Sequence, residues 1–145
     1  MGGLDIPVVI IKKPETGAVL SPFPKKIIII MGRSHPAETP SSFMIEGFLR
    51  KFLESKPKEY NQLFSLCEIH IIPMLNPDGV VVGNSRTNLG GVDMNRRWGE
   101  NIIDGCVTPE LNLAKEYIMS LGEKVNIFID VQGHSMADGL LFYSS

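Results

Sequence analysis

A histidine and a glutamate three residues apart follow a continuous apolar run in the segment "IIIIMGRSHPAE". On a helical turn, this spacing puts the side chains of His35 and Glu38 on one face. An imidazole nitrogen and a carboxylate oxygen both suit zinc, and a catalytic zinc site needs three protein ligands plus water. Pairs of this spacing are also common by chance. In that interpretation the glutamate stabilises the start of a helix with its negative charge, and the histidine is an ordinary loop residue. For an isolated pair, the interpretation as a helix start and a loop residue is therefore favoured over a zinc site.

A second group of polar side chains lies in the glycine-rich stretch 83–101, which has neither helical nor strand periodicity. Long loops in compact domains are usually functional or disordered. A guanidinium group can hold a carboxylate with two parallel hydrogen bonds, so several of them could bind an anionic substrate. The stretch is as compatible with a solvated basic loop as with an anion site. Its arginines and asparagines at 84–98 are Asn84, Arg86, Asn88, Asn95, Arg96 and Arg97.

A third group follows the apolar run at 127–129, in the segment "DVQGHS" that contains Gln132 and His134. Polar residues where a buried strand emerges often belong to a site. His70, in contrast, alternates with Ile69 and Ile71 along a predicted strand, which indicates a structural role.

These groups need elements that bring them together, and the chain predicts strands that alternate with helices. Thr39-Pro40 and Thr108-Pro109 are helix starts, because threonine caps a helix and proline suits its first position. Alternation of this kind predicts an α/β domain with three layers, in which helices cover both faces of a mostly parallel sheet. Sites then lie beyond the carboxyl ends of the strands. The predicted strands are 8–11, 25–32, 67–75, 125–131 and 140–143, the helices are 39–53 and 108–121, and 76–79 is a turn.

Composition bounds the function classes. The chain has 145 residues, enough for one domain, and a net charge of −2 with no basic block, which argues against nucleic acid as a partner. Its apolar runs are too short to span a bilayer and no secretory signal is recognisable, so no membrane partner is expected. Cys67 and Cys106 are far apart and are predicted to be free thiols of an intracellular protein.

Four segments occur in an order that resembles one known family. They are "HPAETPSSFMIEGFLRKFL", "IIPMLNPDGVVVGNSR", "GVDMNRRW" and "DVQGHS". Together they resemble the zinc metallocarboxypeptidases, specifically the cytosolic branch that trims glutamates from tubulin and other protein tails. The resemblance extends from "IPVVII" to "GLLFY". It implies that residues 1–145 form the N-terminal half of a zinc-carboxypeptidase-like domain in a cytoplasmic hydrolase.

The resemblance also implies roles for individual residues around the metal. His35 and Glu38 match the first two zinc ligands, and Asp93 matches the carboxylate that orients the first histidine. The family pattern at the third ligand is D-x-H-G-H-S, whereas this chain has Gln132 there. An amide oxygen is a poor zinc ligand beside imidazole. On a regular strand His134 would sit about 6–7 Å further along, so weak or absent zinc binding is expected.

On the substrate side, the resemblance assigns the loop residues. Arg86 matches the side chain that polarises the scissile carbonyl and stabilises its oxyanion. Asn95 and Arg96 match the clamp on the terminal carboxylate of the substrate. The partner that the resemblance implies is a peptide or protein C-terminal tail, with the glutamate-rich tails of tubulin as the example.

Two interpretations of the function follow. The first is a zinc-dependent carboxypeptidase that removes C-terminal residues, glutamate by resemblance. The second is a pseudoenzyme that binds acidic tails through Arg86, Arg96 and Arg97 without cleaving them. In the family the general-base glutamate lies downstream of this segment, so the sequence is expected to be a fragment of a longer enzyme or an inactive truncated relative. Open apolar sheet edges in such a chain would favour self-association.

Overall fold

A four-stranded mixed sheet forms the centre of the computed structural model, which describes residues 3–12, 25–54, 57–101, 107–134 and 139–144. The strand order is β1-β3-β2-β4. Three strands are parallel, and β1 at one edge runs antiparallel to β3. The predicted mostly parallel sheet is thus confirmed. The strands are β1 (Val9–Ile11), β2 (Lys26–Gly32), β3 (Cys67–Ile72) and β4 (Val125–Val131).

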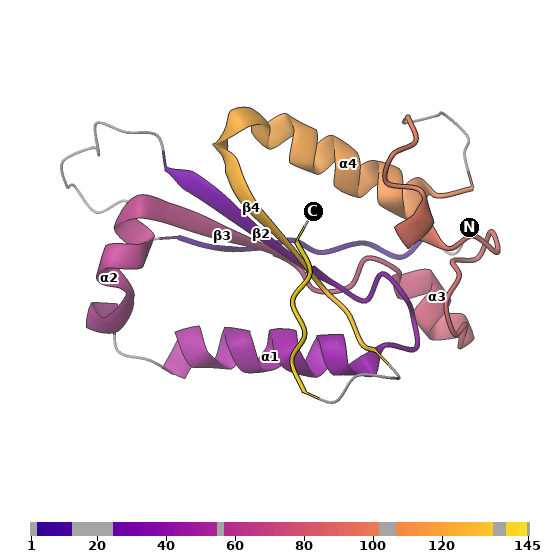
Figure 1. Ribbon diagram of the computed structural model, residues 1–145, viewed down its shortest axis with the longest axis horizontal. Helices are drawn as coiled ribbons and strands as arrows, with labels where there is room; N and C mark the ends of the chain where they lie inside the picture. The colour runs from indigo at the N-terminus through magenta and orange to yellow at the C-terminus, as the bar shows by residue number, and fades with distance from the viewer. Residues whose placement is uncertain (1–2, 13–24, 55–56, 102–106, 135–138, 145) are drawn as a thin grey trace.

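Helices cover both faces of this sheet, as Figure 1 shows. One face carries α1 (Thr39–Glu54) and α2 (Pro57–Leu66), and the other carries α4 (Pro109–Leu121). This is the three-layer α/β architecture expected from the alternation of elements. A short helix, α3 (Pro77–Val82), and two 3₁₀ turns, η1 (Met94–Arg96) and η2 (Gly122–Lys124), complete the described elements. None of the helices in the described ranges has the length and apolar character needed to cross a membrane.

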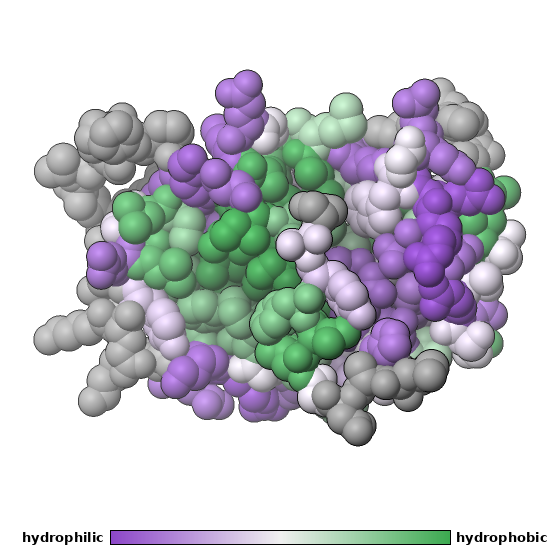
Figure 2. All heavy atoms as spheres, in the orientation of Figure 1, coloured by the Kyte–Doolittle hydropathy of each residue, from purple (hydrophilic) through white to green (hydrophobic). Residues whose placement is uncertain are grey.

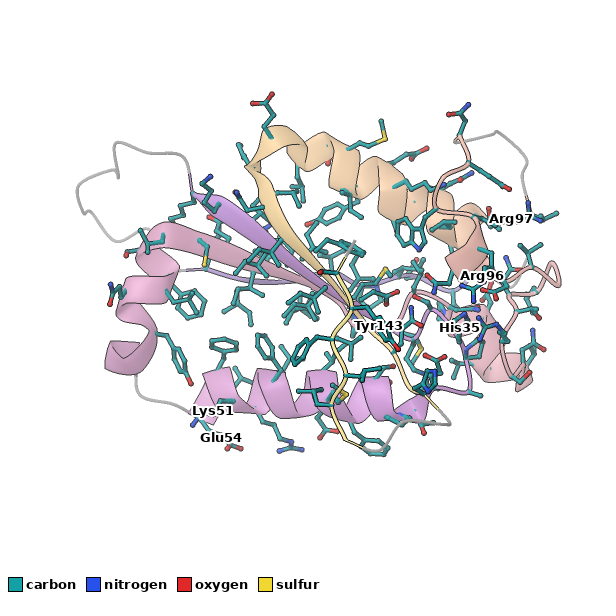
Figure 3. The ribbon with its side chains drawn as sticks, viewed as in Figure 1. His35, Lys51, Glu54, Arg96, Arg97 and Tyr143 are labelled. Atoms are coloured by element: carbon teal, nitrogen blue, oxygen red, sulfur yellow. The ribbon has the colours of Figure 1, made fainter. Side chains whose placement is uncertain are left out.

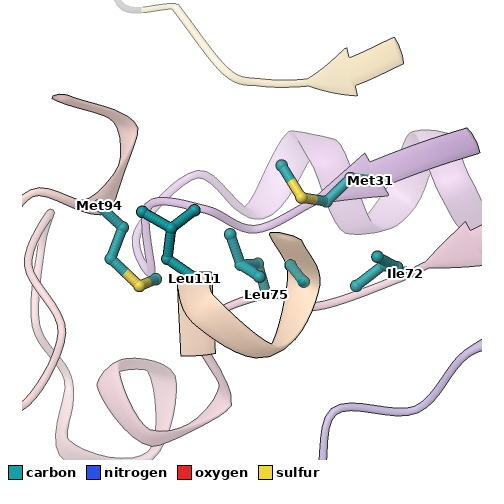
Figure 4. Packing of buried hydrophobic residues seen from close by; sticks show 6 residues of the cluster. Met31, Ile72, Leu75, Met94 and Leu111 are labelled. Carbon is teal, nitrogen blue, oxygen red and sulfur yellow. The ribbon is translucent and has the colours of Figure 1, made fainter. Parts of the chain in front are cut away.

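The apolar run of β2 explains its central position. Its isoleucines pair in register with β3 on one side, Ile28 with Ile69, and with β4 on the other, Ile30 with Ile129. Branched side chains on both faces of a central strand are buried by the helices above and below. One core cluster lies towards α4 and joins Met31, Ile72, Leu75, Met94, Leu111 and Ala114 (Figure 4). The second lies towards α1 and joins Ile30, Ile45, Ile69 and Ile71.

Two helices were not predicted from the sequence. The segment 57–66 forms α2, where Leu63 and Phe64 pack on the α1 side of the core. Asn-Pro-Asp-Gly was interpreted as a turn, yet Asn76 caps α3 by accepting a hydrogen bond from the Gly79 amide at 3.0 Å. The same residue types serve turns and helix starts, because an asparagine cap and a proline at the first helical position are also helix signals.

Three further expectations were wrong in detail. β3 ends at Ile72 instead of residue 75, because the chain turns into α3. Leu53 is 83% exposed instead of lying on the buried stripe of α1. Residues 140–143 form no strand, and their apolar side chains are exposed. A strand needs a hydrogen-bonded neighbour, and the described residues offer 140–143 none.

The structural role expected for His70 is confirmed. The side chain is buried, and its Nδ1 lies 2.7 Å from the Tyr117 hydroxyl of α4. Burial, together with the nearby charge of Glu68, raises the pKa of Tyr117 above its ordinary value. Cys67 is a free, buried thiol, whereas Cys106 lies outside the described residues.

One edge of the sheet is open on both faces. β4 pairs only with β2 among the described strands, and Ile127, Phe128 and Ile129 are 49%, 40% and 42% exposed. Figure 2 shows an apolar surface in this central region of the molecule. An unpaired apolar edge is a template for pairing with another chain. If β4 of a second copy paired antiparallel with Phe128 opposite Phe128, Ile127 of each copy would lie opposite Ile129 of the other. Parallel pairing in register would instead place the two Asp130 side chains next to each other.

We therefore expect the 145-residue chain to self-associate through β4. Ile127→Lys should shift the population towards monomer, because a charged side chain on the edge blocks strand addition. Sedimentation velocity over a concentration series would measure this. Leu53→Lys, at a more exposed site on α1, is the control and should leave the association unchanged. A strict monomer at every concentration of the unmodified chain would contradict this expectation.

Candidate active site

The turn between β2 and α1 carries His35 and Glu38. Gly32 ends β2, and its carbonyl accepts a hydrogen bond from the Leu75 amide at 2.9 Å. The Ala37 amide donates to the carbonyl of Ser85 at 3.1 Å, so the turn is tied to the long loop as well. His35 is 2% exposed. The turn is therefore tied to the segment that follows β3 and to the loop that follows α3.

His35 lies between two carboxylates. Its Nδ1 is 2.7 Å from Oε1 of Glu38, and its Nε2 is 3.0 Å from Oδ1 of Asp93. Asp93 is 58 residues away in sequence, yet it contacts the ring nitrogen that faces away from Glu38. A carboxylate that is hydrogen-bonded to one ring nitrogen of a histidine fixes the orientation of the ring, and so the direction in which the other nitrogen points. The structure thus places Asp93 in contact with His35, whereas its role as the carboxylate that orients a zinc ligand stays a prediction.

Asp93 also joins this histidine to the arginine loop. Its Oδ2 accepts a hydrogen bond from Nε of Arg86 at 2.6 Å, and its Oδ1 accepts one from the Asn95 amide at 3.1 Å. Burial works against the charged form of Asp93. Hydrogen bonds and positive charge from Arg86 and His35 outweigh it, so the pKa of Asp93 lies below its ordinary value. Asp93 is thus a charged centre that orients three neighbours.

The carboxyl end of β4 completes the arrangement. The Gly133 amide donates to Oε2 of Glu38 at 2.9 Å, which places Gln132 beside the His35–Glu38 pair. The Gln132 amide nitrogen donates to Oδ2 of Asp130 at 2.5 Å. Burial raises the pKa of Asp130 above its ordinary value, although hydrogen bonds from Gln132 and Ser34 act in the opposite direction. The side chain of Gln132 is therefore held by its own strand.

A pocket of about 510 Å³ opens over these residues. Figure 3 shows His35 and Arg96 at the same end of the molecule, beyond the carboxyl ends of the parallel strands. Such a position is where α/β sheets bind ligands. Its walls include polar side chains from all three motif groups of the sequence. The lining residues are Ala37, Glu38, Pro40, Arg86, Asn95, Arg96, Gln132, Gly133 and His134.

Most site residues expected from the sequence are brought together here, but not all polar loop residues belong to the pocket. Asn84 donates to the Thr87 and Asn88 carbonyls, and Asn88 is buried against the Val107 carbonyl and Glu110. These two asparagines shape the loop instead of lining the pocket. Arg97 forms an ion pair with Glu100 and also lies outside the lining.

Ser34 and Gly79 also support the site, although neither is a site residue expected from the sequence. The Ser34 hydroxyl donates to Oδ1 of Asp130 at 3.4 Å, which links the turn after β2 to β4. A Cβ on Gly79 of α3 would lie only 2.7 Å from Cγ of Pro36 and 2.5 Å from Oδ1 of Asn76. Ser34 stands in the quoted motif and could have been found there, whereas the close approach at Gly79 depends on tertiary packing.

Gly79→Ala is expected to displace the turn that carries His35. The added methyl group would overlap both Pro36 and the capping side chain of Asn76, and overpacking of this kind costs about 1–3 kcal/mol. Urea unfolding would measure the loss of stability. Gly47→Ala on α1 is the matched control, because nothing lies within 4 Å of a Cβ there. Equal stability of the two variants would contradict the expectation.

The donor atoms at this site meet the needs of zinc only in part. His35 Nδ1 and Glu38 Oε1 face each other, as two ligands of one metal would. Among the described residues, however, no group of three His, Cys, Asp or Glu side chains could hold a metal ion. Gln132 stands at the third position with its amide nitrogen turned to Asp130. Within the described part of the chain, His35 and Glu38 are thus two donors suited to zinc, and Gln132 offers a neutral amide.

Comparison with known proteins agrees with these motifs. Residues 1–130 match the family model described as zinc carboxypeptidase. The chain belongs to the zinc carboxypeptidase family. It is 36% identical to cytosolic carboxypeptidase 2 of Danio rerio over 121 residues, 82% of this chain and 16% of the fish protein. It is 38% identical to cytosolic carboxypeptidase 6 of Mus musculus over 123 residues, 81% of this chain and 22% of the mouse protein.

Solved metallo-carboxypeptidase structures share this fold. A metallo-carboxypeptidase from Pseudomonas aeruginosa, in complex with (2-guanidinoethylmercapto)succinic acid, superposes with a TM-score of 0.76 at 27% identity. The match covers 91% of this chain and 32% of that one. A metallo-carboxypeptidase from Burkholderia cenocepacia gives a TM-score of 0.72 at 30% identity, over 88% of this chain and 32% of that one. The chain thus spans less than a third of the length of these relatives.

Proposed function

We propose that this chain provides the substrate pocket of a carboxypeptidase-type protein and binds the C-terminal carboxylate of a peptide. The main support for this proposal is that the guanidinium group of Arg96 is available to a ligand. Its side chain lines the pocket and is exposed, and none of the carboxylates in the described residues pairs with it. Arg86 and Arg97 are each paired already, with Asp93 and Glu100. Arg96 is therefore the guanidinium best placed to receive an incoming carboxylate.

The other residues of the pocket support this assignment. Asn95 also lines it and lies beside Arg96, so its side-chain amide can donate to the same chain end. Arg86 lines the pocket from the other part of the loop, and Asp93 holds its Nε. An arginine held in this way can direct its remaining donors at a peptide carbonyl. We propose that Arg86 does so, in the manner that the family resemblance implies.

The substrate class is proposed to be acidic protein tails. Two guanidinium groups line a pocket of about 510 Å³, which favours a terminal residue that carries a second carboxylate. The named relatives are cytosolic carboxypeptidases, which is consistent with glutamate-rich tails as ligands and with a cytoplasmic location. We further propose that residues 1–145 act as one unit, the N-terminal half of a zinc-carboxypeptidase-like domain.

Titration with matched peptides tests the binding function. A peptide that ends in glutamate with a free carboxylate should bind, and its C-terminally amidated form should bind at least about tenfold more weakly, because a charge-assisted hydrogen bond contributes about 1.5–3 kcal/mol. Isothermal titration at low salt, where exposed charges are least screened, measures both affinities. Equal affinity for the two peptides would exclude recognition of the chain end.

Hydrolysis is the second candidate function, and the His35–Glu38 geometry favours it. Their facing atoms, 2.7 Å apart, are of the types that bind zinc in this family, and bound zinc would supply a Lewis acid that activates water. The third position limits this candidate, because Gln132 offers only a neutral amide. Release of free glutamate from a glutamate-ended peptide in the presence of zinc would establish it.

A further inference from the structure

We propose that Arg33 is a positioning residue that holds the His35–Glu38 turn in its binding geometry from behind. Arg33 is only 8% exposed, and its side chain contacts the turn that contributes Ala37 and Glu38 to the pocket. The side chains that line the pocket do not include it. Its importance for ligand binding rests on the function proposed above, whereas its hold on the turn rests on contacts within the chain.

The guanidinium group of Arg33 is hydrogen-bonded to the backbone of the turn. Nε and Nη2 both donate to the carbonyl oxygen of Pro36, at 3.1 and 2.7 Å. Nη1 donates to the hydroxyl of Ser42 on α1 at 2.9 Å. The fork therefore connects the middle of the turn to the first turns of the following helix. The carbonyl that it holds belongs to the residue directly after His35.

The backbone of Arg33 is fixed as firmly as its side chain. Its amide donates to the Ser41 hydroxyl at 3.1 Å, and that hydroxyl donates to the Glu38 carbonyl at 2.9 Å. Its own carbonyl accepts from the Asn76 amide at 3.2 Å. Arg33 is therefore connected to the backbone of Glu38 through the Ser41 hydroxyl, in addition to its side-chain bonds to Pro36. Both members of the His35–Glu38 pair are thus positioned by one side chain and one amide.

Arg33 has two energetically unfavourable features, which surrounding contacts must stabilise. Arg33 has a positive φ of 55°, where a side chain is strained, and within the described ranges it is the one non-glycine residue that does. Its buried guanidinium group pairs with none of the carboxylates in the described residues. Strain and a buried charge persist only where surrounding contacts over-determine them, and they cluster at functional sites. Lysine lacks the planar fork and could not reproduce the two bonds to Pro36.

Three variants separate a positioning role from a general contribution to folding. Arg33→Gly removes the fork but relieves the strain at positive φ, which limits the loss of stability. Arg33→Lys keeps the charge without the fork. Arg50→Ala is the control, since Arg50 is exposed on α1 and pairs with Glu46 of its own helix. For each variant, the ring nitrogen resonances of His35, the urea midpoint and the affinity for a glutamate-ended peptide would be measured.

We expect Arg33→Gly and Arg33→Lys to shift the ring resonances of His35 and to weaken peptide binding by roughly tenfold, because displacements of about 1 Å at such sites are costly. Arg50→Ala should change neither. Unchanged His35 resonances in a folded Arg33→Gly chain would overturn the proposal, whatever the urea midpoint. If Arg33→Gly does not fold, Arg33→Lys, which lacks the planar guanidinium group, is the deciding variant, and unchanged His35 resonances in its folded chain would overturn the proposal equally.

The two proposals fail separately. If the unmodified chain binds no glutamate-ended peptide, the proposed function is wrong, and the His35 resonances still test the hold of Arg33 on the turn. If peptide binds and Arg33→Gly leaves both its affinity and the His35 resonances unchanged, only the positioning role is wrong.

Discussion

Gln132→His is expected to raise the affinity of this chain for zinc by at least about tenfold. Loss of a residue that only supports a metal ligand costs about 10–100-fold in affinity, and a direct ligand should matter at least as much. The Gly133 amide contacts Glu38 at 2.9 Å, so an imidazole at the preceding position would extend beside the His35–Glu38 pair. It would supply the third strong donor that catalytic zinc sites have.

A competition titration against a coloured chelator would measure the zinc affinity of both chains. Gln62→His on α2 is the control for an added exposed histidine, because residue 62 is exposed and lies outside the pocket. Equal zinc affinity in the Gln132→His and Gln62→His chains would show that position 132 does not face the metal. Tightly held, stoichiometric zinc in the unmodified chain would show that Gln132 or His134 serves as a ligand already.

Arg96→Ala should weaken the binding of a glutamate-ended peptide by about 10–100-fold. The variant removes a charge-assisted, potentially bidentate partner of the terminal carboxylate, and such bonds contribute about 1.5–3 kcal/mol. The fold should be unaffected, since Arg96 is exposed and holds none of the carboxylates in the described residues. Titration of the same peptide into both chains would measure the difference.

The neighbouring arginine provides a matched control for this experiment. Arg97 has the same charge and adjacent position but pairs with Glu100 and lies outside the pocket lining. Arg97→Ala should therefore weaken peptide binding only slightly, through the loss of long-range charge. Equal losses in the two variants would mean that net positive charge, and not a defined clamp at Arg96, attracts the peptide.

The sequence by itself determined the elements whose signals are local. The isoleucine run of β2 is apolar enough to require burial on both faces, and the threonine–proline starts of α1 and α4 are helix signals within a few residues. The motif order also indicated the family, and the placement of polar groups after strands indicated one end of the sheet. Local periodicity and spacing carry this information because they need no partner from elsewhere in the chain.

Tertiary structure decided what depends on partners distant in sequence. Asp93 contacts His35 across 58 residues, and Gly133 contacts Glu38 across 95, which no periodicity expresses. The hydrogen bonds from Arg33 to the Pro36 carbonyl could be recognised only in the folded turn. The segments 57–66 and 140–143 differed from expectation for the same reason. The first became a helix by packing on the core, and the second formed no strand because a strand requires a neighbouring edge to bond.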